Sequence, residues 1–394
     1  MGEWAAHYEA QVRDAILGNP VAQRAVRLVS EAAGGAALRA QGADEAAQAR
    51  LLSFMRATSG GQGLVETLAL HLMLHGNAYV QILTDAAGDP AELYALRPER
   101  VSVELDRRGW PIAYGYRTGN MAVRLLAVDG ADERGSVIHL KAINPLDDHY
   151  GLGCINAASG AVAIHNAATV WNKALLDNAA RPSGALVYDS GKDGATLSAA
   201  QFARLKEEME AAFTGAGKAG KPMLLEGGLK WQSLSMTPAD MDFVQLKAAA
   251  ARDIALAFGV PPMMLGLPGD STYANYREAN KALWRQTILP LSAKILDGIA
   301  QGMQPWMPGV ALSVDLERVP ELSEERTALW ERVGAAEFLT AQEKRAMLGL
   351  APVAAGEKAY RRHTQPCLPE DAASQLLAMS FERGAHGNLC QLAR

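Results

Sequence analysis

Two helical segments on either side of a proline pair constrain the second half of the chain. The first segment is predicted to begin at Thr237, where a capping box marks a helix start, and to run for about six turns to Phe258. Gly259 fits a left-handed helix end, and Pro261-Pro262 prevents the helix from continuing. A second helix is expected from Tyr276 to Leu289. Two helices joined in this way suit a moving part better than an active site.

The first of these helices carries an apolar stripe that is nearly all alanine in its middle. Alanine lets helix backbones approach closely, so the helix can pack tightly against copies of itself as well as against a core. We expect a single subunit to expose much of this stripe and oligomerisation to bury it. The residues expected at the contact between subunits are Val244, Ala248, Ala251 and Ala255.

Length and composition indicate an ordinary globular protein. The 394 residues suffice for two or three domains with their own cores, and the chain is 49% hydrophobic and 21% charged. The longest apolar run, Leu64 to Val80, contains Glu66, His71 and His75, so no membrane span is expected. The N-terminus has no basic region before an apolar one, so we expect no secretory signal. Three widely spaced cysteines indicate free thiols in a reducing compartment.

The N-terminal part combines helices with an antiparallel sheet. Residues 3–56 have mostly helical patterns with a break at Gly34-Gly35, and a further helix is expected over 64–76. Alternating segments separated by turn residues then predict strands, in a sheet region that ends near Lys141. The expected strands are Tyr79–Thr84, Val101–Leu105 and Ala113–Arg117.

Helical spacing returns over residues 155–180, and a compact insert separates this helix from the one at Thr237. In the insert we expect a helix opened by a capping box of Ser198 and Gln201. The packing face expected on the 155–180 helix is Ile155, Ala158, Val162, Ala168, Trp171 and Leu175. The strands expected in the insert are Ala185–Tyr188, Met223–Leu225 and Leu229–Trp231.

A glycine-rich segment, Gly215–Pro222, resembles a phosphate-binding loop in its glycines and lysine. Such a loop needs Ser or Thr after the lysine to hold magnesium, and Pro222 has no hydroxyl. The segment also leads from a helix into a strand, so no helix N-terminus faces a phosphate. We interpret it as a flexible turn.

Other motifs of enzymes are incomplete. His71 and His75 have the spacing of metal ligands, but no third ligand is evident, and a packed or solvated pair is the simpler interpretation. There is no Gly-x-Ser-x-Gly elbow, and Gly151-Leu152-Gly153 is too short for a dinucleotide fingerprint. We therefore expect no catalytic residues, no metal and no cofactor. A soluble metabolic enzyme would need a convergent polar site that the sequence does not supply.

Four groups of motifs occur in a fixed order along the chain. They are Leu74–Val80, Val137–Lys141, Ile254–Pro262 with Leu265-Gly266, Ser271–Asn275 and Leu289-Pro290, and Phe338–Pro352 with its Thr340 and Glu343 capping box. Together these motifs resemble the portal proteins of tailed bacteriophages, a group that includes the portals of gene transfer agents, and they follow the family's order from about residue 20 to residue 352. One departure is Gly153-Cys154, where the family usually has Ser-Pro, and it affects the expected start of the 155–180 helix.

The resemblance implies an α+β portal fold that assembles as a ring. The implied parts are N-terminal helices and wing sheet over 1–154, a first stem helix over 155–180, a clip over 181–236, a second stem helix over 237–259, a tunnel loop over 260–275, a long wing helix and return strand over 276–320, crown helices over 321–360, and a flexible tail over 361–394.

The resemblance also implies a function without catalysis. Twelve copies would form the head–tail connector, a channel at one capsid vertex through which a terminase large subunit packages double-stranded DNA that is later ejected. The other implied partners are the major capsid protein and a head–tail adaptor, with no membrane. The implied location is the virion or virus-like particle, assembled in the bacterial host cytoplasm. The alternative is a virion adaptor that forms no channel. The short, alanine-rich chain favours a minimal portal such as those of gene transfer agents.

Two sets of residues are expected to act in this function. The loop after the proline pair would project into the channel, with soft apolar contacts that hold no particular phosphate, although an ordinary surface connector is the alternative. Its residues are Met263, Met264, Leu265, Gly266, Leu267, Gly269, Asp270, Ser271 and Thr272. Lysines of the clip would face the terminase or the adaptor, and these are Lys192, Lys206, Lys218 and Lys221.

The net charge of −5 agrees with non-specific passage of DNA. A protein that holds duplex DNA usually has a basic face, because neutralising phosphates supplies most of the affinity. Each such contact would also raise the barrier to sliding, so a weakly repulsive channel wall is reasonable. Solubility alone is an equally good explanation of the charge.

Overall fold

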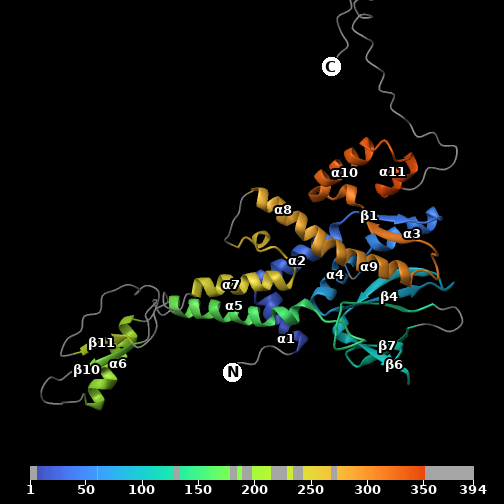
Figure 1. The fold of residues 1–394 in the computed structure, drawn as a ribbon. Coiled ribbons are helices and arrows are strands. Elements are labelled where there is room, and N and C mark those ends of the chain that lie inside the picture. Colours follow the sequence, from blue (N-terminus) through green and yellow to red (C-terminus); the bar gives the residue numbers. More distant parts are fainter. Residues whose placement is uncertain are drawn as a thin grey trace, which may run out of the picture. The chain divides into compact units, whose positions relative to one another are not determined.

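The computed structural model describes residues 7–59, 61–127, 134–177, 184–188, 198–213, 229–233, 243–267 and 273–350. The chain forms two compact units, Met1–Arg326 and Thr327–Arg394. The first unit mixes helices with sheets (Figure 1), and every strand pair in the described ranges is antiparallel. The α+β class expected from the sequence is therefore confirmed.

The N-terminal helices form the main core together with a later helix, α9. Asn19 and Asp44 cap α2 and α3 with their side chains, and Pro20 occupies the first position of α2, where its missing N–H costs no hydrogen bond. The buried stripe of α2 packs against α4. The elements are α1 (Tyr8–Val12), the π-helix η1 (Arg13–Leu17), α2 (Pro20–Gly35), α3 (Glu45–Arg56), α4 (Leu64–Leu74) and α9 (Leu289–Gly302).

Two three-stranded sheets follow, with strand orders β5-β4-β9 and β6-β7-β8. The helices α4 and α9 contact the first sheet, and a second, smaller core lies around Tyr79 and Tyr114. The strands are β4 (Asn77–Thr84), β5 (Pro90–Leu96), β6 (Val101–Leu105), β7 (Pro111–Thr118), β8 (Met121–Leu126) and β9 (Val137–Lys141). A short 3-10 helix, η2 (Pro98–Arg100), precedes β6.

The three strands expected in this region are confirmed, but β5 and β8 were not expected. Both contain residues with high helix propensity, such as Ala91, Glu92 and Leu93 in β5. Pairing with β4 and β7 overrides that local preference. The short strands β1 (Leu38–Gln41), β2 (Thr58–Ser59) and β3 (Gln62–Gly63) also had no sequence signal, and β1 pairs with β12 (Ala311–Val314).

The helix expected to end at Leu289 is longer than predicted. α8 (Tyr273–Leu283), the π-helix η7 (Trp284–Ile288) and α9 form one continuous rod (Figure 1). Pro290 cannot donate a backbone hydrogen bond, and the wider π turn directly before it lets the rod continue through this position. The proline in the first turn of α9 therefore does not end the rod.

A buried hub fixes where the chain leaves the first sheet. Gly76 has a φ of +79°, and a Cβ there would lie 2.4 Å from the carbonyl carbon of Leu152. The buried Asn77 side chain accepts hydrogen bonds from the N–H of Gly151 (2.7 Å) and from Nε2 of His139 (3.0 Å), and it donates to the carbonyl of Gly151. The Gly-Asn-Ala-Tyr and Gly-Leu-Gly motifs are therefore joined by hydrogen bonds, directly before the helix that begins at Cys154.

The insert and the C-terminal part agree with their predicted elements. In the insert, β10 (Gly184–Tyr188) pairs with β11 (Leu229–Ser233), and α6 (Ala199–Phe213) begins at the expected capping box, with reciprocal bonds of 3.0 and 3.3 Å between Ser198 and Gln201. The strand expected at Met223–Leu225 lies outside the described residues. The later elements are the 3-10 helices η8 (Leu316–Arg318) and η9 (Pro320–Leu322), α10 (Ser323–Ala335), and α11 (Ala341–Met347) with its Thr340 capping box.

Candidate functional site

Two helices that lie side by side form the centre of the candidate site (Figure 1). They are α5 (Cys154–Asp177) and α7 (Phe243–Ala257), which pack along each other, and α7 also contacts α2. The helix expected over 155–180 is confirmed. The N-terminal end expected for the second helix, from Thr237, lies outside the described residues.

Polar side chains fasten α5 to the N-terminal helices. The Asn19 side chain caps α2 through its oxygen and donates its amide hydrogens to Nδ1 of His165 (3.1 Å) and Oδ1 of Asn166 (2.9 Å). Asn166 in turn donates to the carbonyl of Asp14. Burial, with a smaller contribution from the Lys247 ammonium, lowers the pKa of His165, which keeps the ring neutral and able to accept. One side of α5 is thus fixed against the body of the first unit.

The expected exposure of the alanine stripe on α7 is wrong for its described middle. Ala251 and Ala255 are buried within the single chain, because α5 packs along α7. Ala248 is half-buried, and the side chain of Val244 lies outside the described residues. The alanines therefore allow close packing inside the protomer, and Ala251 and Ala255 cannot lie at a contact between subunits unless the two helices separate.

Large apolar side chains are exposed elsewhere on the same two helices. On α5, Ile155, Ala158, Val162 and Ala168 are buried as expected, but Trp171 is exposed, and the side chain of Leu175 is not described. The exposed residues that the sequence reasoning missed are Ile164, Val170, Leu246 and Leu256. The available signal was that each helix carries a second set of apolar residues outside its predicted packing face, but the sequence did not show which of the two sets faces inward.

A rigid bend follows α7. The N–H of Gly259 donates to the carbonyl of Leu256 and the N–H of Val260 to that of Ala255, the two bonds of a Schellman motif. Gly259 has a φ of +65°, as the helix end requires, and its carbonyl accepts a bond of 2.6 Å from Oγ1 of Thr287 on η7. The predicted helix stop is confirmed, and Thr287 ties the bend to the long α8–α9 rod.

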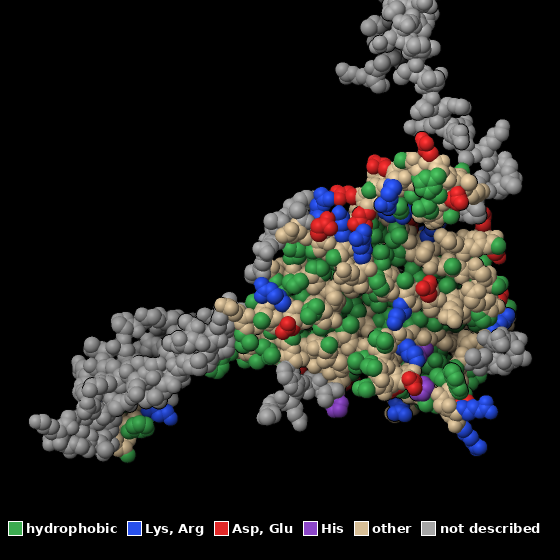
Figure 2. Space-filling view, in the orientation of Figure 1, with side chains coloured by type: hydrophobic (Ala, Val, Ile, Leu, Met, Phe, Trp, Pro, Cys, Tyr) green, Lys and Arg blue, Asp and Glu red, His purple; other side chains and the backbone are tan. Residues whose placement is uncertain are grey.

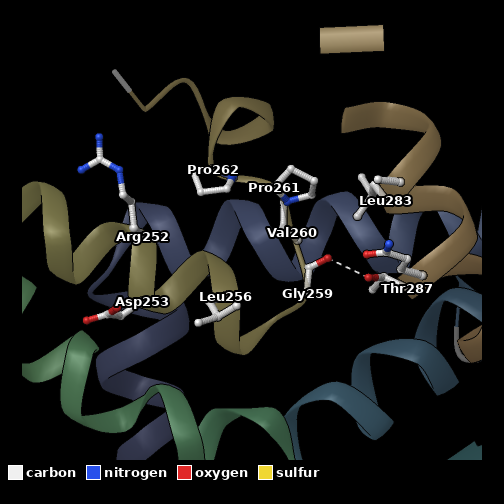
Figure 3. Close-up of a pocket in the computed structure, with 11 residues that line it drawn as sticks. Arg252, Asp253, Leu256, Gly259, Val260, Pro261, Pro262, Leu283 and Thr287 are labelled. Atoms are coloured by element: carbon white, nitrogen blue, oxygen red, sulfur yellow. Dashed lines mark hydrogen bonds between the residues drawn. The ribbon is translucent and has the colours of Figure 1, made fainter. Parts of the chain in front are cut away.

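The bend lines a concavity of about 550 Å³. Figure 3 shows Leu256 on α7, the ring of Pro261 and Leu283 on α8 around it, with Arg252 and Asp253 on α7 at one end. The lining is mostly apolar, apart from that charged pair and the Gln286 and Thr287 side chains. Such a surface suits the packing of an apolar partner better than the binding of a charged ligand.

The residues expected in the channel loop are only partly placed in a loop. Pro262–Leu265 form the 3-10 helix η6, and Met264 and Leu265 pack against the main core, so these two side chains do not project from the protomer as expected. The proline at the first position of η6 and the left-handed Gly266 after it set this short helix. Gly266 is exposed and Leu267 is half-buried, whereas Gly269, Asp270, Ser271 and Thr272 lie outside the described residues.

The clip lysines and the lysine-rich turn are mostly untested. Lys206 is exposed on α6. Lys192, Lys218, Lys221 and the phosphate-loop-like segment lie outside the described residues.

The described residues offer packing surfaces and structural polar groups. No group of three His, Cys, Asp or Glu residues among them is placed to hold a metal ion. His71 is half-buried, its buried Nδ1 has no hydrogen-bond partner, and desolvation lowers its pKa to about 4. Burial also raises the pKa of the Cys154 thiol, which disfavours a reactive thiolate. In the part of the chain that the structure describes, no helix is both long and apolar enough to cross a membrane.

Comparison with known proteins gives one family. The family model described as phage portal protein matches residues 20–349. An uncharacterised protein of Rickettsia bellii is 37% identical over 351 residues, which are 87% of this chain and 90% of that protein. A chain in the neck of a native gene transfer agent particle, computed with C12 symmetry, is 44% identical with a TM-score of 0.67, over 89% of this chain and 95% of that chain. A portal protein of the HK97 family from Corynebacterium diphtheriae, 18% identical with a TM-score of 0.56 over 81% of this chain and 100% of that chain, shares the fold.

Proposed function

The chain belongs to the phage portal protein family, and from this premise we propose that it forms the ring-shaped channel at one vertex of a virus-like particle. Double-stranded DNA enters through this channel during packaging and leaves through it during ejection. The observation that supports this most directly is the 44% identity to a chain in a particle neck of C12 symmetry. The similarity favours a gene transfer agent or a related phage particle as the location, with assembly in the bacterial cytoplasm.

The parts of the protomer take the roles that the family suggests. We assign residues 1–154 to the wing, α5 and α7 to the stem, 181–236 to the clip, 260–275 to the tunnel loop, and α10 and α11 to the crown. The major capsid protein would surround the ring. The terminase large subunit would dock first on the clip, and a head–tail adaptor would replace it. Lys206 on α6, together with Lys192, Lys218 and Lys221, is the proposed contact for these partners.

The stem and the bend after it suit a passage that does not bind DNA tightly. The net charge of −5 and the apolar lining beside Pro261 supply no basic surface for phosphates. The bend is held to η7 by the Thr287 bond, so the segment from Gly266 to Thr272 starts from a fixed root. We propose that this segment contacts the DNA in the channel without sequence preference.

Electron microscopy of the purified protein, paired with its native mass, tests the ring. We expect closed rings of about twelve subunits with an open centre, by the rule that homo-oligomers favour closed cyclic symmetry. A monomer or dimer both in isolation and after co-expression with the capsid protein would contradict the proposal.

Deleting Gly266 to Asp270 separates the channel role from assembly. The deleted residues follow η6 and precede α8 in the sequence, and the two of them that the structure describes, Gly266 and Leu267, do not belong to the main core. Rings should still form, while the DNA retained per particle should fall strongly. A matched change is to replace the same five residues with Gly and Ser, which keeps the length of the loop. Normal packaging by the deletion variant would refute the loop's role and leave the ring untouched.

A further inference from the structure

An exposed apolar stripe runs along α5 on the side opposite its buried stripe. Its members recur at steps of three and four residues over more than four turns, and none is charged. The α5 seam consists of Ala157, Gly160, Ile164, Ala167, Trp171 and Ala174. All are exposed except Gly160, which is half-buried, and Val170 beside the seam is 68% exposed.

A second seam with the same spacing lies on α7. Leu246, Ala249, Asp253 and Leu256 follow one another at steps of three, four and three, and all four are exposed. Leu256 is 79% exposed and lies at the edge of the concavity beside Pro261. This α7 seam again faces away from the buried residues of its own helix, Ala251, Ile254 and Ala255. Hydrophobic side chains accordingly cover much of the visible surface over α5 and α7 (Figure 2).

The spacing indicates what kind of element covers each seam. Alternating steps of three and four place side chains in a line along a helix, which is the arrangement that a second helix packs into. A β-strand or a small ligand would not need a line of this length. The small side chains of Ala157, Gly160 and Ala167 let a helix backbone approach α5 closely, and Ile164 and Trp171 supply the large contacts between them.

The two seams are different surfaces, and a cyclic ring requires two different contact surfaces on each protomer. In a cyclic ring each protomer presents one surface to the neighbour on one side and a different surface to the other neighbour. The α5 seam is uncharged throughout, and the α7 seam has Leu246 and Leu256 at its ends with one acidic residue between them. By helical rise the α7 seam spans about 15 Å and the α5 seam about 26 Å, so one can lie along the other.

We propose that the α5 seam of one protomer packs against the α7 seam of the next, with the concavity at the Pro261-Pro262 bend receiving an apolar side chain of the neighbour's α5. This rests on the proposed portal function, since it names the partner of the stem as a second copy of the chain. It gives the proline pair a role in assembly. The bend forms one wall of the concavity, and the hydrogen bond from Thr287 to the Gly259 carbonyl holds that wall against η7.

Single charges placed in the seams test the contact. Ile164→Glu and Leu256→Glu change exposed side chains, so the protomer should keep its fold and its far-ultraviolet circular dichroism. Each should raise the protein concentration needed for half-maximal ring formation by at least about tenfold, the effect of losing one ordinary contact. The matched control is Leu17→Glu, a change of the same kind at a leucine that is 78% exposed outside both seams, and it should leave assembly unchanged. Folded protomers of both seam variants that assemble like the wild type would overturn the proposal.

A photo-cross-link locates the partner surface directly. Ile164→benzoylphenylalanine, in rings mixed from isotope-labelled and unlabelled protein, should attach between protomers to residues 245–262. Attachment within rings to any other segment would refute the seams while leaving the portal function intact. If the wild-type chain forms no rings, alone or in particles, both the seam contact and the proposed portal function fail.

Discussion

Lowering the pH from about 7.5 to about 5 should destabilise the first unit of the chain through histidines whose pKa values are lowered by desolvation, above all His71 and His139. Burial lowers the pKa of His71 from 6.5 to about 4, and the Glu99 carboxylate only partly offsets this. Burial also lowers the pKa of His139 to about 4, with smaller contributions from the Lys141 ammonium and from His75. His139 donates through Nε2 to the hub residue Asn77, and its lowered pKa keeps the ring neutral at pH 7.5.

The direction of the change in stability follows from the pH at which each ring binds a proton in the folded and in the unfolded chain. Both pKa values are lower in the folded chain, so the unfolded chain takes up protons first as the pH falls. The stability that the neutral rings contribute is fully present above about pH 6.5 and is lost progressively down to about pH 4. At pH 5 the difference between the two states is about 2 kcal/mol for each histidine, or about 4 kcal/mol together. Carboxylates remain mostly ionised above pH 5, so the window isolates the histidines.

Urea unfolding at fixed protein concentration measures this loss. For a chain of this size, with a slope of about 3 kcal/mol per molar urea, the midpoint should fall by about 1 M between the two pH values. His139→Gln keeps an amide donor for Asn77 and removes the titrating ring, so its loss of stability between the two pH values should be about 2 kcal/mol smaller than that of the wild type. The control is His7→Gln, at an exposed position, which should behave like the wild type.

Two results would refute the reasoning. One is a midpoint that does not change between pH 7.5 and pH 5 in the wild type, because the rings of His71 and His139 could not then have the lowered pKa values. The other is a His139→Gln variant whose loss equals that of the wild type, which would show that the hub histidine does not contribute.

Three further changes test single features. Gly76→Ala places a Cβ 2.4 Å from the carbonyl carbon of Leu152, in a residue whose φ is +79°. The variant should lose about 3 kcal/mol or more of folding free energy, which is measured as a clear fall in Tm. An unchanged Tm would contradict the close packing of the hub. Thr287→Val removes the bond to the Gly259 carbonyl and should cost about 1 kcal/mol in the same assay, whereas no loss would mean that the bend is held without it. Thr340→Ala removes the capping box of α11 and should weaken that helix by about 1 kcal/mol, measured as faster hydrogen exchange over residues 341–347 with no change in the first unit, and equal exchange would refute the cap.

Local signals in the sequence located most elements of the fold. The capping boxes at Ser198 and Thr340 and the Gly259 stop before two prolines are confirmed where they were predicted. These signals are local because a cap or a stop is satisfied by residues within one turn. The motifs of the portal family could also be recognised from the sequence, and the match of the family model to residues 20–349 confirms the resemblance.

Contacts distant in sequence were the part that local signals missed. The pairing of β1 with β12 joins Leu38 to Val314, and β5 and β8 form although their residues favour helices. The helix at Leu289 was expected to stop, yet the π turn of η7 carries it past Pro290. Each of these depends on partners that sequence spacing does not identify.

The sequence by itself determined that α5 and α7 are helices with apolar stripes, because their apolar residues recur at the helical period of 3.6 residues. Only the tertiary structure decided which stripe faces inward. Both helices carry two apolar faces, and the alanines of α7 were the natural choice for a contact between subunits. Packing along α5 buries Ala251 and Ala255 inside the protomer and leaves Leu256 and Ile164 outside. The physical reason is that burial depends on which side of a helix the neighbouring elements lie, and no residue spacing within that helix encodes where those elements are.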